Sequence, residues 1–177
     1  MSKDPLRLLF LADTHVPRRA RALPAQVWQE VHRADVVFHA GDWQVPELLD
    51  ELESRARRLV GVWGNNDGSE LRERLPETAR VEIGGIRFAM THETGPARGR
   101  EKRMAAAFSD ADVLVFGHSH IPWDTVAGDE TANPGLRLLN PGSPTDRRRQ
   151  PQCTLMTAQT VNGRLIDVRL VPVDRSR

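Results

Sequence analysis

The first 63 residues alternate short apolar runs with amphipathic segments, and this alternation restricts the fold more than any other feature of the sequence. Apolar runs at residues 6–12, 35–40 and 58–63 predict buried strands, and the segments 24–33 and 46–54 between them predict helices. Strands connected through helices pair in parallel, because the crossover has to pack back onto the same sheet. We therefore expect a parallel sheet whose functional loops lie at the carboxyl ends of its strands.

The pattern changes beyond residue 80, where strands joined by tight turns dominate. Gly84-Gly85 and Val161-Asn162-Gly163 are turn signals between apolar segments and predict two hairpins, at 80–91 and 153–171. A parallel half followed by an antiparallel half predicts an α/β fold of two packed sheets with helices outside. No repeat, low-complexity tract or long linker interrupts the chain, so residues 1–177 are expected to form a single domain. The remaining predicted elements are a helix at 99–108 and strands at 112–116, 123–127 and 136–139.

Charge and cysteine content exclude several classes of protein. Twenty-five basic residues against 24 acidic ones give a formal net charge of +1, whereas a protein that holds nucleic acid stably usually shows a larger basic excess. The single cysteine, Cys153, excludes an internal disulfide framework and a cysteine-based zinc cluster. No stretch approaches the roughly 18 apolar residues of a membrane span, and the first apolar run is too short for a signal peptide. These observations favour a cytoplasmic protein with neither a membrane nor nucleic acid as a stable partner.

Polar side chains of the metal-ligating types directly follow five of the predicted strands. If these strands share a sheet, the loops that follow them converge on one edge. Alternate residues of an extended segment point the same way, so Asp13 with His15, and His118 with His120, can each offer two ligands from one loop. The five clusters are Asp13-Thr14-His15, Gly41-Asp42, Gly64-Asn65-Asn66-Asp67, Thr91-His92 and Gly117-His118-Ser119-His120.

With Asn66 and Asp67 set aside, the clusters supply two carboxylates, one amide oxygen and four imidazoles, which is more than a single tetrahedral zinc ion uses. Shared between two ions with one bridging carboxylate, the set provides about four protein ligands for each ion. Oxygen and nitrogen donors without a thiolate suit Mn, Fe, Zn, Ni or Co rather than Ca. Two such ions roughly 3.5–4 Å apart form the clamp used for in-line displacement at phosphorus.

Each cluster on its own has a plainer explanation as a solvated loop, because Asp-x-His and Gly-Asp occur often by chance. All five in this order, each after an apolar run, favour the metal interpretation.

The ordered set of motifs resembles the calcineurin-like metallophosphoesterases. The short length, the Gly-His-Ser-His-Ile-Pro string at 117–122 and the Asn-Pro-Gly-Ser string at 140–143 are similar to the small prokaryotic YfcE-like phosphodiesterase branch. The resemblance spans roughly residues 6–145 and implies a four-layer α/β/β/α sandwich. It also implies a metal-dependent phosphoesterase, and within that class a phosphodiesterase, in which a hydroxide held between two divalent ions attacks phosphorus.

Carried over by position, the resemblance assigns the metal ligands and, among them, the candidate catalytic residues Asp42, Asn65 and His92. Manganese is the favoured ion, and iron, nickel and zinc are also compatible with the donors. The resemblance implies that Asp13, His15 and His120 hold one ion, that Asp42 bridges both, and that Asn65, His92 and His118 complete the second site.

Two positions depart from the family pattern. The larger family has a histidine after the asparagine of its third motif, where it helps protonate the leaving oxygen, and this chain has Asn66 there. An amide cannot act as a general acid at neutral pH, and such catalysis is typically worth roughly 10²–10⁴-fold. We therefore expect a modest enzyme that favours phosphodiesters with good leaving groups, with Asn66 in contact with the substrate. Glu93 follows His92 where glycine is more usual; it would tune the second metal site, repel a dianionic monoester or be a solvated loop residue.

Two tryptophans adjoin these motifs. Trp43 follows the bridging carboxylate and is a candidate for stacking on a base or an aryl ester of the substrate, with core packing as the plainer alternative. Trp63 precedes its turn on a predicted strand and is expected in the core.

Three functions are compatible with these observations. The first is a phosphodiesterase acting on a small phosphoester, and the second is a phosphomonoesterase or nuclease with the same metals and a different pocket. The third is a non-catalytic protein-interaction scaffold of the same fold, like the retromer sorting subunit, whose site residues are degraded. All seven ligand positions here hold competent donors, which favours an enzyme. Relatives in the family are often homo-oligomers, so self-association is a further expectation.

Overall fold

The computed structural model describes residues 4–174 and contains the strands and helices predicted for the first third of the chain. Strands β1 (Leu6–Leu11), β2 (Val36–His39) and β3 (Leu59–Gly61) pair in parallel. They are linked through α1 (Ala25–Arg33) and α2 (Pro46–Arg55). None of the helices within residues 4–174 is both long enough and apolar enough to cross a membrane.

A third helix, α3 (Ser69–Arg74), was not predicted. It has six residues, of which only Leu71 is buried. A single apolar contact leaves no helical periodicity in the sequence, so the pattern on which the other helices were predicted is absent here.

Two sheets are present as predicted, but the division into a parallel and an antiparallel half is wrong. The C-terminal hairpin, β9 (Cys153–Val161) and β10 (Arg164–Val173), joins the N-terminal strands, because β9 pairs antiparallel with β1. The first sheet therefore has the order β10-β9-β1-β2-β3, and the second has β4-β5-β6-β8-β7. In the second sheet the two inner pairs are parallel and the two outer pairs are antiparallel. Its strands are β4 (Thr78–Ile83), β5 (Ile86–Thr91), β6 (Val113–Val115), β7 (Trp123–Val126) and β8 (Arg137–Asn140).

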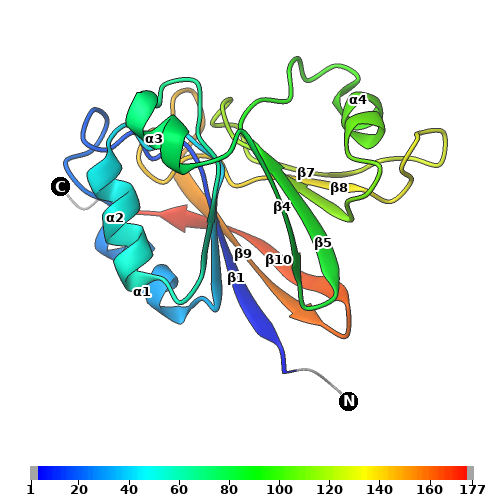
Figure 1. Ribbon diagram of the computed structural model, residues 1–177, viewed down its shortest axis with the longest axis horizontal. Coiled ribbons are helices and arrows are strands. Elements are labelled where there is room, and N and C mark those ends of the chain that lie inside the picture. The colour runs from blue at the N-terminus through cyan, green and yellow to red at the C-terminus, as the bar shows by residue number, and fades with distance from the viewer. Residues whose placement is uncertain (1–3, 175–177) are drawn as a thin grey trace.

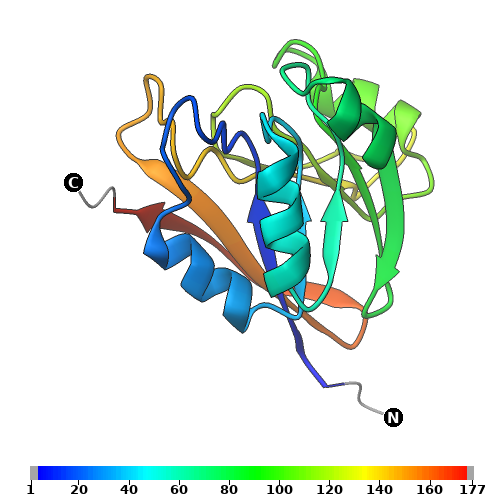
Figure 2. The ribbon, with the colours of Figure 1, turned by 60° about the vertical axis from the view of Figure 1, so that its left-hand side comes forward.

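The layers follow the predicted α/β/β/α order. Helices α1 and α2 cover the outer face of the first sheet, and α4 (Arg100–Ala107) lies on the outer side of the second (Figures 1 and 2).

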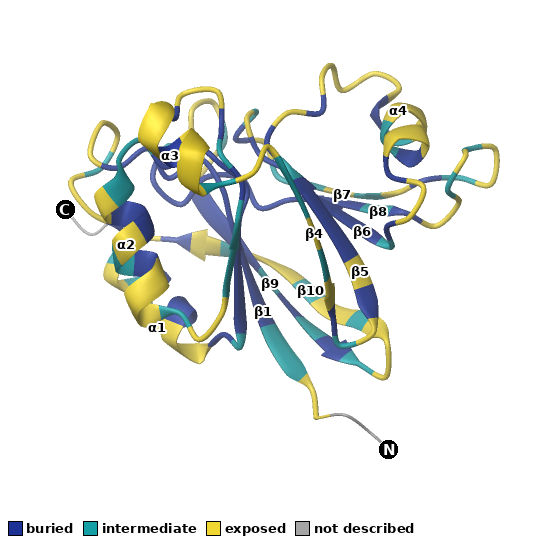
Figure 3. Ribbon diagram, viewed as in Figure 1, coloured by how far each residue is buried: buried dark blue, intermediate teal, exposed yellow. Residues whose placement is uncertain are grey.

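Successive side chains of β1 point to opposite faces of the first sheet, and the apolar residues on both faces are buried (Figure 3). Leu8 and Phe10 point into the core between the sheets, whereas Leu9 and Leu11 pack under the helices. Between the sheets the ring of Phe38 lies 5.1 Å from that of Phe10 and 4.9 Å from that of Phe88, measured between centroids. Fully burying a side chain of this size stabilises the fold by roughly 1.5–3 kcal/mol. The strands beneath the polar loops are therefore held rigidly from both sides.

Candidate metal centre

Loops from both sheets meet beyond the carboxyl ends of β1, β2, β3, β5 and β6, toward which the arrowheads of β1–β3 point in Figure 2. Backbone hydrogen bonds join the loops directly. Asp13 N donates to the Gly41 carbonyl at 2.9 Å, and Gly117 N donates to the His92 carbonyl at 3.1 Å. The convergence of the five polar clusters expected from the sequence is present.

Two groups of carboxylate and imidazole atoms lie close enough together to hold a metal ion. Asp13, His15 and His120 form one group, and Asp13, Asp42 and His92 form the other. Asp42 Oδ2 lies 3.5 Å from His15 Nε2 and 3.4 Å from His92 Nε2, so this oxygen faces both groups. Asp13 Oδ1 lies 3.6 Å from His120 Nε2 and 4.0 Å from His92 Nε2. Both carboxylates therefore reach both groups, whereas the sequence indicated a bridging position for Asp42 alone.

The two other predicted ligands, Asn65 and His118, lie beside the second group. Asn65 Oδ1 is 3.0 Å from His92 Nε2 and 3.0 Å from His118 Nδ1. The His118 side chain is 48% exposed, whereas His15, His92 and His120 are buried. Asn65 and His118 thus form the accessible rim of the cluster.

Backbone carbonyls determine which nitrogen of two buried histidines faces the centre. His92 Nδ1 donates to the Ala40 carbonyl at 2.7 Å, and His120 Nδ1 donates to the Asp146 carbonyl at 2.7 Å. A carbonyl can only accept, so Nδ1 carries the proton and Nε2 is left to bind a cation. His15 differs, because Gln44 Nε2 lies 2.8 Å from its Nδ1 and an amide nitrogen donates, so Nδ1 is the acceptor there. Neither Gln44 nor Asp146 was expected at the centre, because neither belongs to a sequence motif.

Asp13 is the clearest sign that the cluster is built for a cation. Its side chain is fully buried and Oδ1 accepts a hydrogen bond from His118 N at 3.1 Å, but Oδ2 has no hydrogen-bond partner among residues 4–174. Burial raises the pKa of Asp13 to about 8, because a desolvated carboxyl group favours its neutral form. A divalent cation would supply the missing partner and keep the carboxylate ionised. The oxygen and nitrogen donors present fit divalent transition-metal ions.

Asp42 and His92 stabilise each other's charge. Burial disfavours both charged forms, but the hydrogen bond to Asp42 and the charges of Asp13 and Asp42 raise the pKa of His92 to about 9. Burial also opposes ionisation of Asp42, yet hydrogen bonds from His92 and Asn66 hold the pKa of Asp42 well below its usual range. Asn66 donates to Asp42 twice, from its backbone N to Oδ1 at 2.9 Å and from Nδ2 to Oδ2 at 2.7 Å. The side chain predicted to contact substrate therefore supports the shared carboxylate in this structure.

A second carboxylate holds the backbone around Asp42. Asp67 Oδ2 accepts from Gly64 N at 2.7 Å and from Asp42 N at 3.0 Å, and Asp67 Oδ1 accepts from Gln44 N at 2.8 Å. Asp67 thus binds backbone N–H groups of two loops. Gly64 packs so closely that a Cβ at this position would overlap the Asp42 carboxylate.

The strand-end motif Asn140–Ser143 and the residues after it secure the loop that carries Asp13. Ser143 Oγ donates to the Asp13 carbonyl at 2.7 Å, and Thr145 Oγ1 donates to the Thr14 carbonyl at 2.6 Å. Both hydroxyls are buried, so each bond also satisfies a polar group that would otherwise be costly to bury.

Most of the candidate ligands have an uncommon backbone conformation. Left-handed φ values cost roughly 1–3 kcal/mol for residues other than glycine and persist where surrounding structure enforces them, often at functional sites. No local sequence signal predicted them. The φ angles are 54° at Asp13, 44° at His15, 62° at Asp42, 69° at His118 and 59° at His120.

Trp43 does not face the centre. Its ring is fully buried and stacks on His39 with 3.6 Å between ring centroids, while Nε1 donates to the Val62 carbonyl at 2.8 Å. The prediction that Trp43 contacts substrate is therefore wrong, since no part of the ring is accessible. His39 itself is buried and its Nε2 lies 2.9 Å from Thr14 Oγ1, and burial lowers its pKa to about 3.

Comparison with known proteins identifies the family. Residues 6–163 match the model of the calcineurin-like phosphoesterase superfamily domain, and this segment contains every candidate ligand. The chain belongs to the calcineurin-like phosphoesterase superfamily. A probable metallophosphoesterase of Methanocaldococcus jannaschii is 32% identical over 168 residues, which cover 93% of this chain and 80% of the relative. A phosphodiesterase of the same organism is 25% identical over 131 residues, which cover 65% of this chain and 74% of the relative.

A solved structure shares the fold of this chain. Vacuolar protein sorting 29 from Cryptosporidium parvum superposes with a TM-score of 0.74 at 18% identity, covering 97% of this chain and 99% of the other. At this identity the similarity concerns the fold alone. The family and the two-sheet fold expected from the sequence are therefore confirmed.

Proposed function

We propose that this protein is a metal-dependent phosphodiesterase that hydrolyses small phosphoesters at a dinuclear centre. One observation carries the proposal: two ligand groups share two carboxylates, and one of these, Asp13, is fully buried with an unpartnered oxygen. A structural carboxylate would have its hydrogen bonds satisfied by protein groups.

The proposed ligand assignment divides the cluster in two. Asp13, His15 and His120 would hold one ion, and Asn65, His92 and His118 the other, with Asp42 between them. The position of Asp42 Oδ2, within 3.5 Å of a histidine Nε2 on either side, supports this division. When bound, two divalent ions would activate a water molecule for attack on phosphorus and neutralise charge on the phosphoryl oxygens.

The side chains of the centre carry the remaining roles. In the metal-free centre Asp42 stays ionised because His92 and Asn66 donate to it, and Asn65 Oδ1 lies 3.0 Å from both His92 Nε2 and His118 Nδ1. With ions bound, His92 Nε2 would bind metal instead, and Asn66 would remain the donor to Asp42. We propose that Asn66, which is exposed at the rim, also meets the substrate. Since its amide cannot protonate a leaving alkoxide, the centre favours diesters with good leaving groups over alkyl monoesters.

Hydrolysis of bis(4-nitrophenyl) phosphate tests the proposal. Chelator-treated protein should be inactive and should recover activity with Mn²⁺, the ion we favour, with Fe²⁺, Ni²⁺ and Zn²⁺ compared beside it. His118→Ala should remove the activity without unfolding the protein, because this side chain is half exposed. His32→Ala, at an exposed position on α1, is the matched control and should keep it.

The same assay contains the result that would overturn the proposal. Folded protein that hydrolyses neither the diester nor 4-nitrophenyl phosphate with any of these ions would exclude the enzyme and favour a protein-interaction scaffold of the same fold. Activity on 4-nitrophenyl phosphate alone would instead identify a monoesterase.

A further inference from the structure

A side cavity opens directly beside the second ligand group. Its volume is about 310 Å³, which is within the range of small-ligand sites and large enough for a small organic group. Two of its lining residues, Asn65 and His92, belong to the centre, so a group held in the cavity would touch the reacting phosphate. The other lining residues are Trp63, Arg72, Glu77, Thr91 and Glu93.

One wall of this side cavity is planar and rigidly supported. The Arg72 guanidinium lies 4.2 Å from the centroid of the Trp63 ring, an arrangement that favours cation–π attraction. Arg72 Nε donates to the Asp67 carbonyl at 2.8 Å and Nη2 donates to the Asn65 carbonyl at 3.2 Å. The backbone of Trp63 is tied to the Pro76 carbonyl at 3.1 Å. The wall is therefore preorganised, which reduces the entropy lost when a ligand binds.

The rim of the side cavity is acidic. Glu77 and Glu93 are both exposed, and Glu93 Oε1 lies 4.0 Å from His118 Nδ1. Arg72 offsets one of these charges; its Nε and Nη2 each donate to a backbone carbonyl, and one face of its guanidinium lies against the Trp63 ring. A second anionic group would therefore meet two carboxylates, whereas a cation or hydrogen-bond donor would be attracted.

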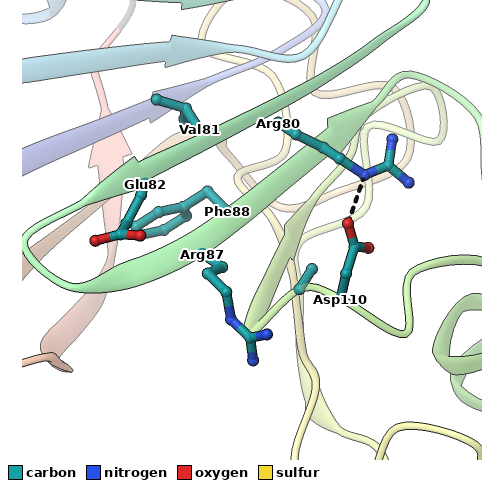
Figure 4. A pocket seen from close by; sticks show the side chains of 7 residues that line it. Arg80, Val81, Glu82, Arg87, Phe88 and Asp110 are labelled. Carbon is teal, nitrogen blue, oxygen red and sulfur yellow. Dashed lines mark hydrogen bonds and ion pairs between the residues drawn. The ribbon is translucent and has the colours of Figure 1, made fainter.

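Another cavity of similar size lies away from the metal centre. It has a volume of about 350 Å³ and lies at the opposite end of the β4–β5 hairpin (Figure 4). Its two arginines pair with acidic neighbours, Arg80 Nε with Asp110 Oδ2 at 3.1 Å and Arg87 Nη2 with Asp112 Oδ1 at 2.6 Å. It shares no lining residue with the metal centre.

We infer that the side cavity receives one ester arm of the phosphodiester substrate and selects a cationic arm over neutral or anionic arms of the same size. The inference rests on the proposed phosphodiesterase function and adds a substrate class: diesters in which one alcohol carries an amine or quaternary ammonium group. Trp63 supplies an apolar surface for such a group, and Glu77 and Glu93 supply the compensating charge.

Three synthetic diesters with the same 4-nitrophenol leaving group test this selection. Their other arms are choline, its neutral isostere 3,3-dimethylbutanol, and 3-hydroxypropanoate. Wild-type protein should give the order choline, neutral, anionic in kcat/KM. In Glu77→Gln/Glu93→Gln the ratio of choline to neutral ester should fall by about 5-fold, since exposed pairs contribute roughly 0.2–1 kcal/mol each. Glu82→Gln, an exposed change at the far end of the same hairpin, should leave the ratio unchanged.

The ratio separates this inference from the proposed function. If the diesters are hydrolysed but the double variant keeps the wild-type ratio, the selective cavity is excluded while the phosphodiesterase stands. If no diester is hydrolysed, the proposed function fails and this inference fails with it. Binding adds a readout that does not depend on turnover: titrating metal-free protein with the choline ester should shift the indole N–H resonance of Trp63, assigned with Trp63→Phe. An unmoved Trp63 resonance would also overturn the inference.

Discussion

Asp13→Asn tests the centre most directly, because Asp13 is the fully buried carboxylate common to both ligand groups. Asparagine keeps the shape of the side chain and removes its charge. In metal-free protein the ionised form of Asp13 is costly, since burial raises the pKa from 3.8 to about 8. The folded protein therefore holds this proton more tightly than the unfolded chain does, and the free energy of unfolding falls as pH rises from about 4 to about 8.

The size of the effect follows from the pKa. One pH unit corresponds to roughly 1.4 kcal/mol for one proton, and the slope lessens as Asp13 becomes half ionised near pH 8, so Asp13 accounts for a fall of about 2 kcal/mol between pH 6 and pH 8. His92 adds to the fall in the same direction, because its pKa is raised from 6.5 to about 9 and its stabilisation is lost as pH rises through that value. Asp13→Asn removes the first contribution and weakens the second, since the Asp13 charge is one cause of the His92 shift.

Urea unfolding in EDTA at pH 6 and pH 8 measures this difference, with Asp129→Asn at an exposed position as the control. Wild type and control should lose stability at pH 8, and Asp13→Asn should lose much less. Adding Mn²⁺ should then stabilise wild type and control, by about 2.7 kcal/mol at 100 times the dissociation constant, and should not stabilise Asp13→Asn. If Asp13→Asn kept the wild-type pH dependence, the buried carboxyl group of Asp13 would not be its source. If Mn²⁺ stabilised Asp13→Asn as much as wild type, Asp13 would not be needed to bind the ion.

Three further outcomes are expected. Gly64→Ala should abolish the rise in melting temperature that Mn²⁺ causes, because its Cβ would displace the Asp42 carboxylate; an unchanged rise would show that Asp42 is not needed. Trp43→Ala should reduce the free energy of unfolding in urea by roughly 3–5 kcal/mol, as for other buried aromatic side chains, and a loss below about 1 kcal/mol would contradict its place in the core. Binding of Mn²⁺ at pH 7 should release protons, because Asp13 and His92 have pKa values of about 8 and about 9 and must lose protons to bind metal. Calorimetry in two buffers of different ionisation enthalpy measures that release, and equal heats would disprove it.

Much of the fold could be predicted because its signals are local. Apolar runs indicate buried strands, a 3.6-residue apolar period indicates amphipathic helices, and paired glycines indicate turns. These signals placed most elements to within a few residues. The pairing of β9 with β1 joins residues about 150 apart, as in Leu6 with Thr160, and no local pattern specifies such a partner. Helix α3 has too little apolar surface to leave a pattern at all.

The chemistry that the centre can offer could be predicted from the sequence, because the identity of each donor and its place directly after a strand are properties of the chain. Tertiary structure decided what those donors face. It buried Trp43 against His39, turned Asn66 toward Asp42, and supplied Gln44 and the Asp146 carbonyl as partners for His15 and His120. It also left one oxygen of Asp13 without a partner. Each of these depends on packing between segments distant in the chain, where burial and hydrogen-bond geometry, rather than local propensity, set the free energy.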